Sequence, residues 1–434
     1  MIYKTRKLDN GLTIIGIPLK DSKTTTVLTL VGVGSRYESD AELGLSHFLE
    51  HMMFKGTKKR PTAKIIAQEL DGLGASYNAF TSYEYTGYWV KVRNQKKYIA
   101  LDIIADIFQN SLLQESDIKV ERGAITEELN MYLDMPTRQI HSDFQSLLYG
   151  NTPLGRPIIG TKESIHSFTR PDFIEYVSQK YVTSNTYIII AGEVDTNILD
   201  KVEASFNNAR QAESPKKIEI KIEQSKPKIN IRHKKTDQTH LMLGFHIPSI
   251  HSQDRYIAAM ASTILGGYMS SRLFTEIREK RGLSYYIRSD SHHFDDTGVF
   301  SINTGVQNIN VVDTLKLILK ELKDIKSYTV SDRELNIAKE HIQGQTVMGF
   351  ESSDEIAAII GMNELLLQEP FDLEYEMEQY KAVTKDQILD FMQKYTLSQH
   401  LNLALIGAMT ALCSIGVVII SIFSFVLRAS LITP

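Results

Sequence analysis

The amino-acid sequence predicts an α+β protein built from two related domains, on three observations. The chain has 434 residues, which is more than one typical domain contains, and 42% of them are hydrophobic, enough to build more than one core. Residues 207–230 are polar, rich in lysine and carry two prolines, as is typical of a linker. Beyond them, the strand and helix order of the first half begins again. We therefore expect domains at residues 1–206 and 231–407, joined by the linker at 207–230.

Hydrophobic periodicity and turn residues predict the elements of the first half. Two strands are expected between residues 4 and 34, around a turn at Asp9, Asn10 and Gly11. The elements expected next are helices at 44–56 and 62–73, strands within 75–92, helices at 97–112 and 116–133, and a buried strand at 187–193. The pattern therefore mixes strands and helices throughout this half.

The second half repeats this pattern in a weaker form. A strand is expected at 239–246, a helix at 256–265 and a further strand at 299–306. Residues 273–289 predict a basic helix end followed by a strand, and residues 401–407 a last strand. His292 and His293 lie beside acidic residues, where a polar loop is more plausible than a second metal site.

Residues 408–427 form a stretch of twenty residues without a charge, long enough to cross a bilayer as a helix. We expect a tail anchor there; the alternatives are a buried terminal element or an extension that disturbs the last strand. The N-terminus carries no apolar or Arg/Ser-rich leader. These features predict a cytoplasmic protein, associated with a membrane through its tail.

Charge and cysteine content exclude several function classes. The formal net charge is −4, with acids and bases mixed along the chain, so no basic surface for nucleic acid is expected. The single cysteine, Cys413, rules out an intrachain disulfide and suits a reducing compartment.

Three residues in the helix at 44–56 point to metal chemistry: His47, Glu50 and His51, in the order H-x-x-E-H. Residues four apart share a helix face, so two neutral imidazoles could bind one zinc ion at about 2 Å. Glu50 borders that face as a general base. Since two histidines leave the zinc incomplete, a third ligand is needed. The simpler interpretation is a core helix with two incidental histidines.

Carboxylates on the helix at 116–133 are the best candidates for that ligand. Glu121 and Glu128 lie two turns apart and face the same way, and Glu127 is a neighbouring alternative. The residues alone do not choose between Glu127 and Glu128.

These motifs resemble the pitrilysin/insulinase family of inverted-zincin metallopeptidases, most closely its short-chain processing-peptidase branch, over residues 1–406. The resemblance implies Glu128 as the third ligand, at the family's distance from the second histidine, with Glu127 as its neighbour. It implies Glu121 as a supporting carboxylate that helps to orient the site. It also implies two related α/β-sandwich domains, each a mixed or antiparallel sheet covered by helices, which form half of a clamshell chamber.

The resemblance also implies residues that bind substrate. Asn78, Ala79, Phe80 and Thr81 match the family's edge strand, on which an extended peptide pairs through its main chain. Arg278 and Tyr285 match positions that reach the substrate near the scissile bond, where a tyrosine hydroxyl can stabilise an oxyanion. Arg281 and Tyr286 are close alternatives.

We therefore expect a zinc metalloendopeptidase with one zinc ion per chain. His47, His51 and Glu128 would bind the metal, and Glu50 would act as general base for the attack of zinc-bound water. Substrates would be oligopeptides or unfolded and leader segments, and the active form a homodimer or a heterodimer with a related subunit. The alternative is a non-catalytic core or scaffold subunit of the same fold.

Overall fold

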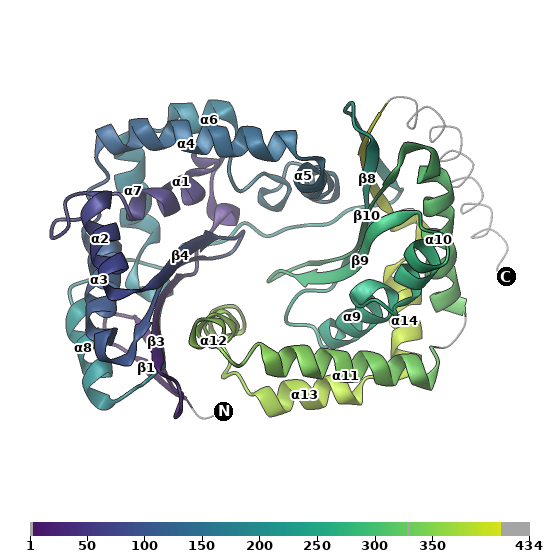
Figure 1. Cartoon of the computed structure of the whole chain (residues 1–434). Coiled ribbons are helices and arrows are strands. Elements are labelled where there is room, and N and C mark those ends of the chain that lie inside the picture. Colours follow the sequence, from purple (N-terminus) through teal and green to yellow (C-terminus); the bar gives the residue numbers. More distant parts are fainter. Residues whose placement is uncertain (1–2, 328–329, 409–434) are drawn as a thin grey trace. The chain divides into compact units, whose positions relative to one another are not determined.

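Figure 1 shows a computed structural model of the chain, which describes residues 3–327 and 330–408. The tail anchor expected at 408–427 lies, beyond its first residue, outside the described residues. Within the described ranges, no helix is both long enough and apolar enough to cross a membrane.

The described chain divides into two compact units. The first unit contains the chain up to Met131, together with Arg156–Ile218 and Val347–Asp372. The second unit contains Tyr132–Gly155, Glu219–Thr346 and the described chain from Leu373 onward. Two segments, Tyr132–Gly155 and Val347–Asp372, thus belong to a different unit from the residues on either side of them in the sequence. The compact units therefore differ from the consecutive division expected from the sequence.

The first unit is a six-stranded sheet with helices on both faces. Its strands, in the order β1-β2-β6-β3-β5-β4, are β1 (Lys4–Lys7), β2 (Thr13–Pro18), β6 (Thr186–Gly192), β3 (Thr24–Val31), β5 (Thr86–Arg93) and β4 (Ser76–Thr81). Its helices are α1 (Leu45–Met53), α2 (Ala63–Leu73), α3 (Lys97–Asn110), α4 (Glu115–Asp134), α6 (Lys162–Ser167), α7 (Arg170–Lys180), α8 (Thr196–Phe206) and α12 (Ser353–Leu367). Residues 4–34 form three strands instead of the two expected.

Helices from distant parts of the chain cover the two faces of this sheet (Figure 1). Helix α3 packs on β3 and β5, whereas α12 packs on β3 and β6. Gly361 allows α12 to approach closely, since a Cβ atom there would lie 3.0 Å from the Ile189 side chain. The apolar residues of β3 are buried. Tertiary packing of apolar faces therefore assigns α12 to the first unit.

The second unit is a five-stranded sheet with its own hydrophobic core. Its strands, in the order β7-β11-β8-β10-β9, are β7 (Lys228–His233), β11 (Asn402–Gly407), β8 (Gln238–Ile247), β10 (Gly298–Gln307) and β9 (Ser284–His293). Its α-helices are α5 (Pro136–Tyr149), α9 (Asp254–Ser262), α10 (Val311–Ser327), α11 (Asp332–Met348), α13 (Leu373–Ala382) and α14 (Lys385–Tyr395). Helix α5 packs on β8 and β11, which explains its place in this unit.

The two sheets share one topology. If β1 is left out, each sheet has five strands. When these strands are numbered by their order along the chain, they lie side by side in the order one, five, two, four, three in both sheets. In both, the first and last strands pair in parallel and the remaining pairs are antiparallel. The repeat expected from the sequence is confirmed. In the second unit, α9 follows the strand that corresponds to β3, and α9 carries no H-x-x-E-H.

Candidate metal centre

Helix α1 is fixed by burial of one of its faces. Leu45, Phe48, Leu49, Met52 and Met53 are buried, at the three-to-four residue spacing of an amphipathic helix. The helix packs against β4. Its apolar face therefore determines which way the opposite face, with its two histidines, is turned.

The start of α1 is held by a carboxylate from outside the helix. Gly44 precedes it with φ +93°, and no side chain of the capping residue itself closes the helix. Both oxygens of the buried Glu38 accept hydrogen bonds instead, from Gly44 N at 2.8 Å and Ser46 N at 2.7 Å. Glu38 satisfies donors that a helix N-terminus leaves open. The sequence analysis missed this residue.

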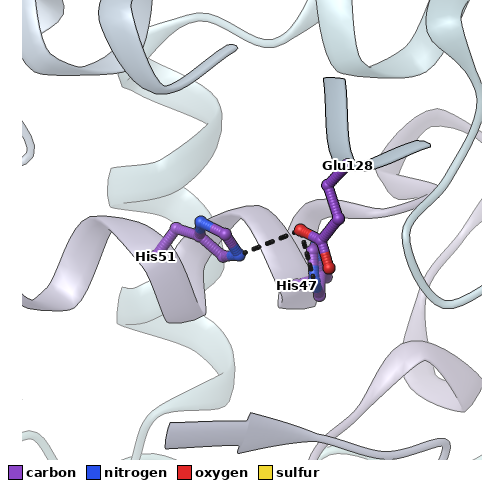
Figure 2. Close-up of side chains that lie close together, drawn as sticks. All are labelled: His47, His51 and Glu128. Carbon is purple, nitrogen blue, oxygen red and sulfur yellow. Dashed lines mark ion pairs between the residues drawn. The ribbon is translucent and has the colours of Figure 1, made fainter. Parts of the chain in front are cut away.

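His47 and His51 project from one face of α1 towards Glu128 of α4 (Figure 2). The Nε2 atoms of His47 and His51 lie 3.7 and 3.5 Å from Glu128 Oε2. One ligand atom from each residue lies within 4.8 Å of the other two, and this is the one such group found among the described residues. The neighbouring Glu127 is exposed and near Asn130. The structure thus brings Glu128, not Glu127, to the histidines.

The donor set fits a zinc ion. Two imidazole nitrogens and one carboxylate oxygen are the ligands that hydrolytic zinc sites use, with a fourth position left for water or substrate. Burial, followed by the charge of His51, lowers the pKa of His47 to about 4. His47 is therefore neutral near pH 7, which is the form that binds a metal ion.

Glu121 supports the site from behind His51. Its Oε1 lies 2.8 Å from His51 Nδ1, which directs the other ring nitrogen, Nε2, towards Glu128. Its Oε2 lies 2.5 Å from Lys55 Nζ. Burial alone would raise the pKa of Glu121, but the hydrogen bonds from His51 and Lys55 outweigh it and lower the pKa. Lys55, one turn after His51, escaped the sequence analysis.

Glu50 lies outside the group of ligands but on the same helix. Its Oε2 accepts a hydrogen bond from Thr81 Oγ1 at 2.5 Å. Burial raises the pKa of Glu50, although the Thr81 hydrogen bond opposes this. A carboxylate with a raised pKa accepts a proton more readily at neutral pH, as a general base must.

Asn78, Ala79, Phe80 and Thr81 belong to β4, which forms one edge of the first sheet. Strand β4 pairs with β5 on one side only. The expected edge strand is thus an edge strand in the structure, and it packs beside α1.

Arg278 and Tyr285 belong to the second unit. Arg278 lies in a π-helical turn, Phe274–Glu279, and its guanidinium is 5.0 Å from the centre of the Tyr285 ring. Tyr285 is 80% exposed, whereas Tyr286 is hydrogen-bonded to His240 at 3.0 Å. Arg281, the alternative to Arg278, forms an ion pair with Glu276 at 2.6 Å. Arg278 also forms an ion pair, with Glu279 at 3.9 Å, so these contacts do not choose between Arg278 and Arg281. The exposure of Tyr285 leaves its ring more accessible to a ligand than that of Tyr286.

An open centre of two histidines and one glutamate, with a further carboxylate on the same helix, is the kind of site that zinc hydrolases use. The model of the insulinase family, peptidase family M16, matches residues 17–162, and that of the peptidase M16 inactive domain matches residues 167–342. An uncharacterized zinc protease of Rickettsia felis is 37% identical, covering 90% of this chain and 94% of that protein. One from Streptomyces coelicolor is 33% identical, covering 92% and 88%. The chain therefore belongs to the insulinase family of peptidases, and the resemblance found in its sequence is confirmed.

Solved structures share the fold. A protease from Helicobacter pylori has a TM-score of 0.88 at 22% sequence identity, covering 94% of this chain and 99% of that one. A chain of Complex III2 from Candida albicans has a TM-score of 0.84 at 19% identity, covering 94% and 97%. At these identities the likeness establishes the α+β fold of two helix-covered sheets expected from the sequence, and nothing about activity.

Proposed function

We propose that this protein is a zinc-dependent endopeptidase that cleaves oligopeptides or unfolded and leader segments. The observation that carries the proposal is the group formed by His47, His51 and Glu128, whose ligand atoms lie close enough to bind one metal ion. Glu50 lies on α1 with the two histidines but outside this group. Zinc bound by this group would supply Lewis acidity, polarising a peptide carbonyl and activating water. The relatives named as zinc proteases support the same metal.

The chain's own residues supply the remaining steps. Glu50 accepts the proton of the attacking water and passes it to the leaving amine. Glu121 holds His51 in the ring orientation that presents Nε2. Strand β4 offers its free edge to an extended peptide, a mode of binding that makes few demands on substrate side chains. The family resemblance assigns Arg278 and Tyr285 to contacts with the substrate near the scissile bond.

The test is zinc content and cleavage of a quenched fluorescent peptide library by the full-length protein and by Glu50→Gln. We expect about one zinc ion per chain in both proteins, and cleavage by the wild type alone. Glu128→Gln should lose zinc, whereas the matched control Glu127→Gln should retain both zinc and activity. Zinc loss in Glu127→Gln but not in Glu128→Gln would contradict the ligand assignment.

A non-catalytic core subunit is the second candidate, because a chain of Complex III2 has the same fold. The complete ligand group and Glu50 argue against it, since a scaffold has no need of either. Wild-type protein that binds no zinc and cleaves no peptide would favour the scaffold.

We also propose that the active form is a dimer, with itself or with a related subunit, enclosing the substrate in a chamber. The one ligand group of the described chain lies in the first unit, so each chain would contribute one zinc site. Light scattering after size-exclusion chromatography measures the assembly, and a monomer with full activity would contradict this proposal.

A further inference from the structure

Thr81 connects two parts of the proposed active site. It is the last residue of β4, and its hydroxyl donates to Glu50 Oε2 at 2.5 Å. The bond joins the edge strand to the proposed general base on α1. A hydroxyl donor to a carboxylate is a charge-assisted hydrogen bond, which is stronger than one between neutral groups.

The hairpin register shows where the backbone of Thr81 points. Ser82 N–H donates to Tyr85 O at 2.8 Å, next to the turn that joins β4 to β5. In an antiparallel ladder, hydrogen-bonded pairs alternate with pairs that are not hydrogen-bonded. The next pair, Thr81 with Thr86, is therefore of the second kind. The N–H and C=O groups of Thr81 face the free edge of the sheet.

Ala79 supports this register independently. It is two residues before Thr81, so its backbone groups also face the free edge. Its N–H donates to the side chain of Asn78 at 2.9 Å, and β5 therefore does not use it. The free edge thus presents the N–H and C=O of Thr81 and the C=O of Ala79 to an incoming strand, at the end of β4 where the Thr81 hydroxyl meets Glu50.

We propose that Thr81 is a positioning residue that couples peptide binding to the general base. Its backbone pairs with the peptide while its hydroxyl orients the carboxylate of Glu50. This inference rests on the proposed endopeptidase function. A peptide paired with β4 would hold the end of the strand in place, and through Thr81 it would hold Glu50 where the attacking water must be deprotonated.

The first experiment compares Thr81→Val, Thr81→Ser and the matched control Thr196→Val in the full-length protein. Valine keeps the shape and strand preference of threonine but removes the donor. We expect Thr81→Val to lower kcat about 10- to 100-fold, the range for loss of a hydrogen bond to a charged group. Its KM should stay within about twofold and its zinc content unchanged, because a positioning residue acts after binding. Thr81→Ser should recover most of kcat.

Thr196, exposed at the start of α8 and outside the proposed site, controls for the replacement of threonine by valine itself. Thr196→Val should match the wild type. The proposal is overturned if Thr81→Val keeps the wild-type kcat, if it loses zinc, or if Thr81→Ser is as impaired as Thr81→Val. A wild-type protein that cleaves nothing would instead contradict the proposed function.

The second experiment measures the coupling. A series of substrates carries one ester in place of one backbone amide at successive positions, which removes single N–H donors from the paired strand. In the wild type we expect one position at which the ester lowers kcat. In Thr81→Val the same ester should lower kcat by a smaller factor, since the connection to Glu50 is already broken. Equal factors in the two proteins would refute the coupling.

Discussion

Glu38 should stabilise the first unit through the start of α1. Its carboxylate accepts two backbone hydrogen bonds, at 2.8 and 2.7 Å, in a fully buried position. Glu38→Ala would leave both donors without an acceptor, and each such buried group costs about 1–3 kcal/mol. We expect the free energy of unfolding to fall by about 2–5 kcal/mol. Glu38→Gln retains one acceptor oxygen and should lose about half as much.

The same carboxyl should make stability depend on pH. Burial raises its pKa from 4.5 to about 7, against the opposing effect of the hydrogen bonds from Gly44 and Ser46. A raised folded-state pKa means that the folded protein favours the protonated acid. Its stabilising contribution is complete below about pH 4.5 and is lost as the pH rises through 7. The shift corresponds to about 3 kcal/mol, at about 1.4 kcal/mol per pKa unit.

The assay is urea unfolding at several pH values between 5 and 8, followed by tryptophan fluorescence. Trp89, the chain's only tryptophan, lies on β5 of the first unit and reports on that unit. Across this range the stability difference between the wild type and Glu38→Gln should move in favour of the variant by most of about 3 kcal/mol as the pH rises. Parallel pH profiles for the two proteins, or a Glu38→Ala variant as stable as the wild type, would refute the reasoning.

Two further predictions concern the metal centre, and a third concerns the buried ion pair between Arg36 and Glu84. Dialysis against a chelator should abolish peptide cleavage, and added zinc should restore it; activity that survives zinc-free dialysis would exclude a zinc mechanism. Glu121→Gln should weaken zinc binding about 10- to 100-fold, because the charge that orients His51 is lost; competition with a chromogenic chelator measures this, and unchanged affinity would contradict the role. Arg36→Met removes a buried guanidinium that lies 2.6 Å from Glu84, and it should lower the free energy of unfolding by about 3–5 kcal/mol. The double variant with Glu84→Leu should recover part of that loss, and no recovery would show that the two residues are not coupled.

The sequence predicted the elements whose signals are local. The apolar spacing of Leu45, Phe48 and Leu49 determines both the helix α1 and the opposite face on which His47 and His51 stand four residues apart. Alternation and β-branching predicted most of the strands, although one of the three strands within residues 4–34 and β7 were missed. The repeated strand–helix order predicted the two related units. The residues alone did not choose between Glu127 and Glu128 as the third metal ligand. The resemblance to the family then identified Glu128.

Only the tertiary structure decided which distant groups meet. Glu38 contacts the start of α1, and Lys55 contacts Glu121, through packing that no spacing in the sequence encodes. Helix α12 joins the first sheet because its apolar face and Gly361 fit β3 and β6, although the surrounding sequence belongs to the second unit. The edge position of β4 depends on the pairing of all six strands. Local periodicity is therefore sufficient to predict a helix and the face it presents, but long-range packing determines the contacts of that face.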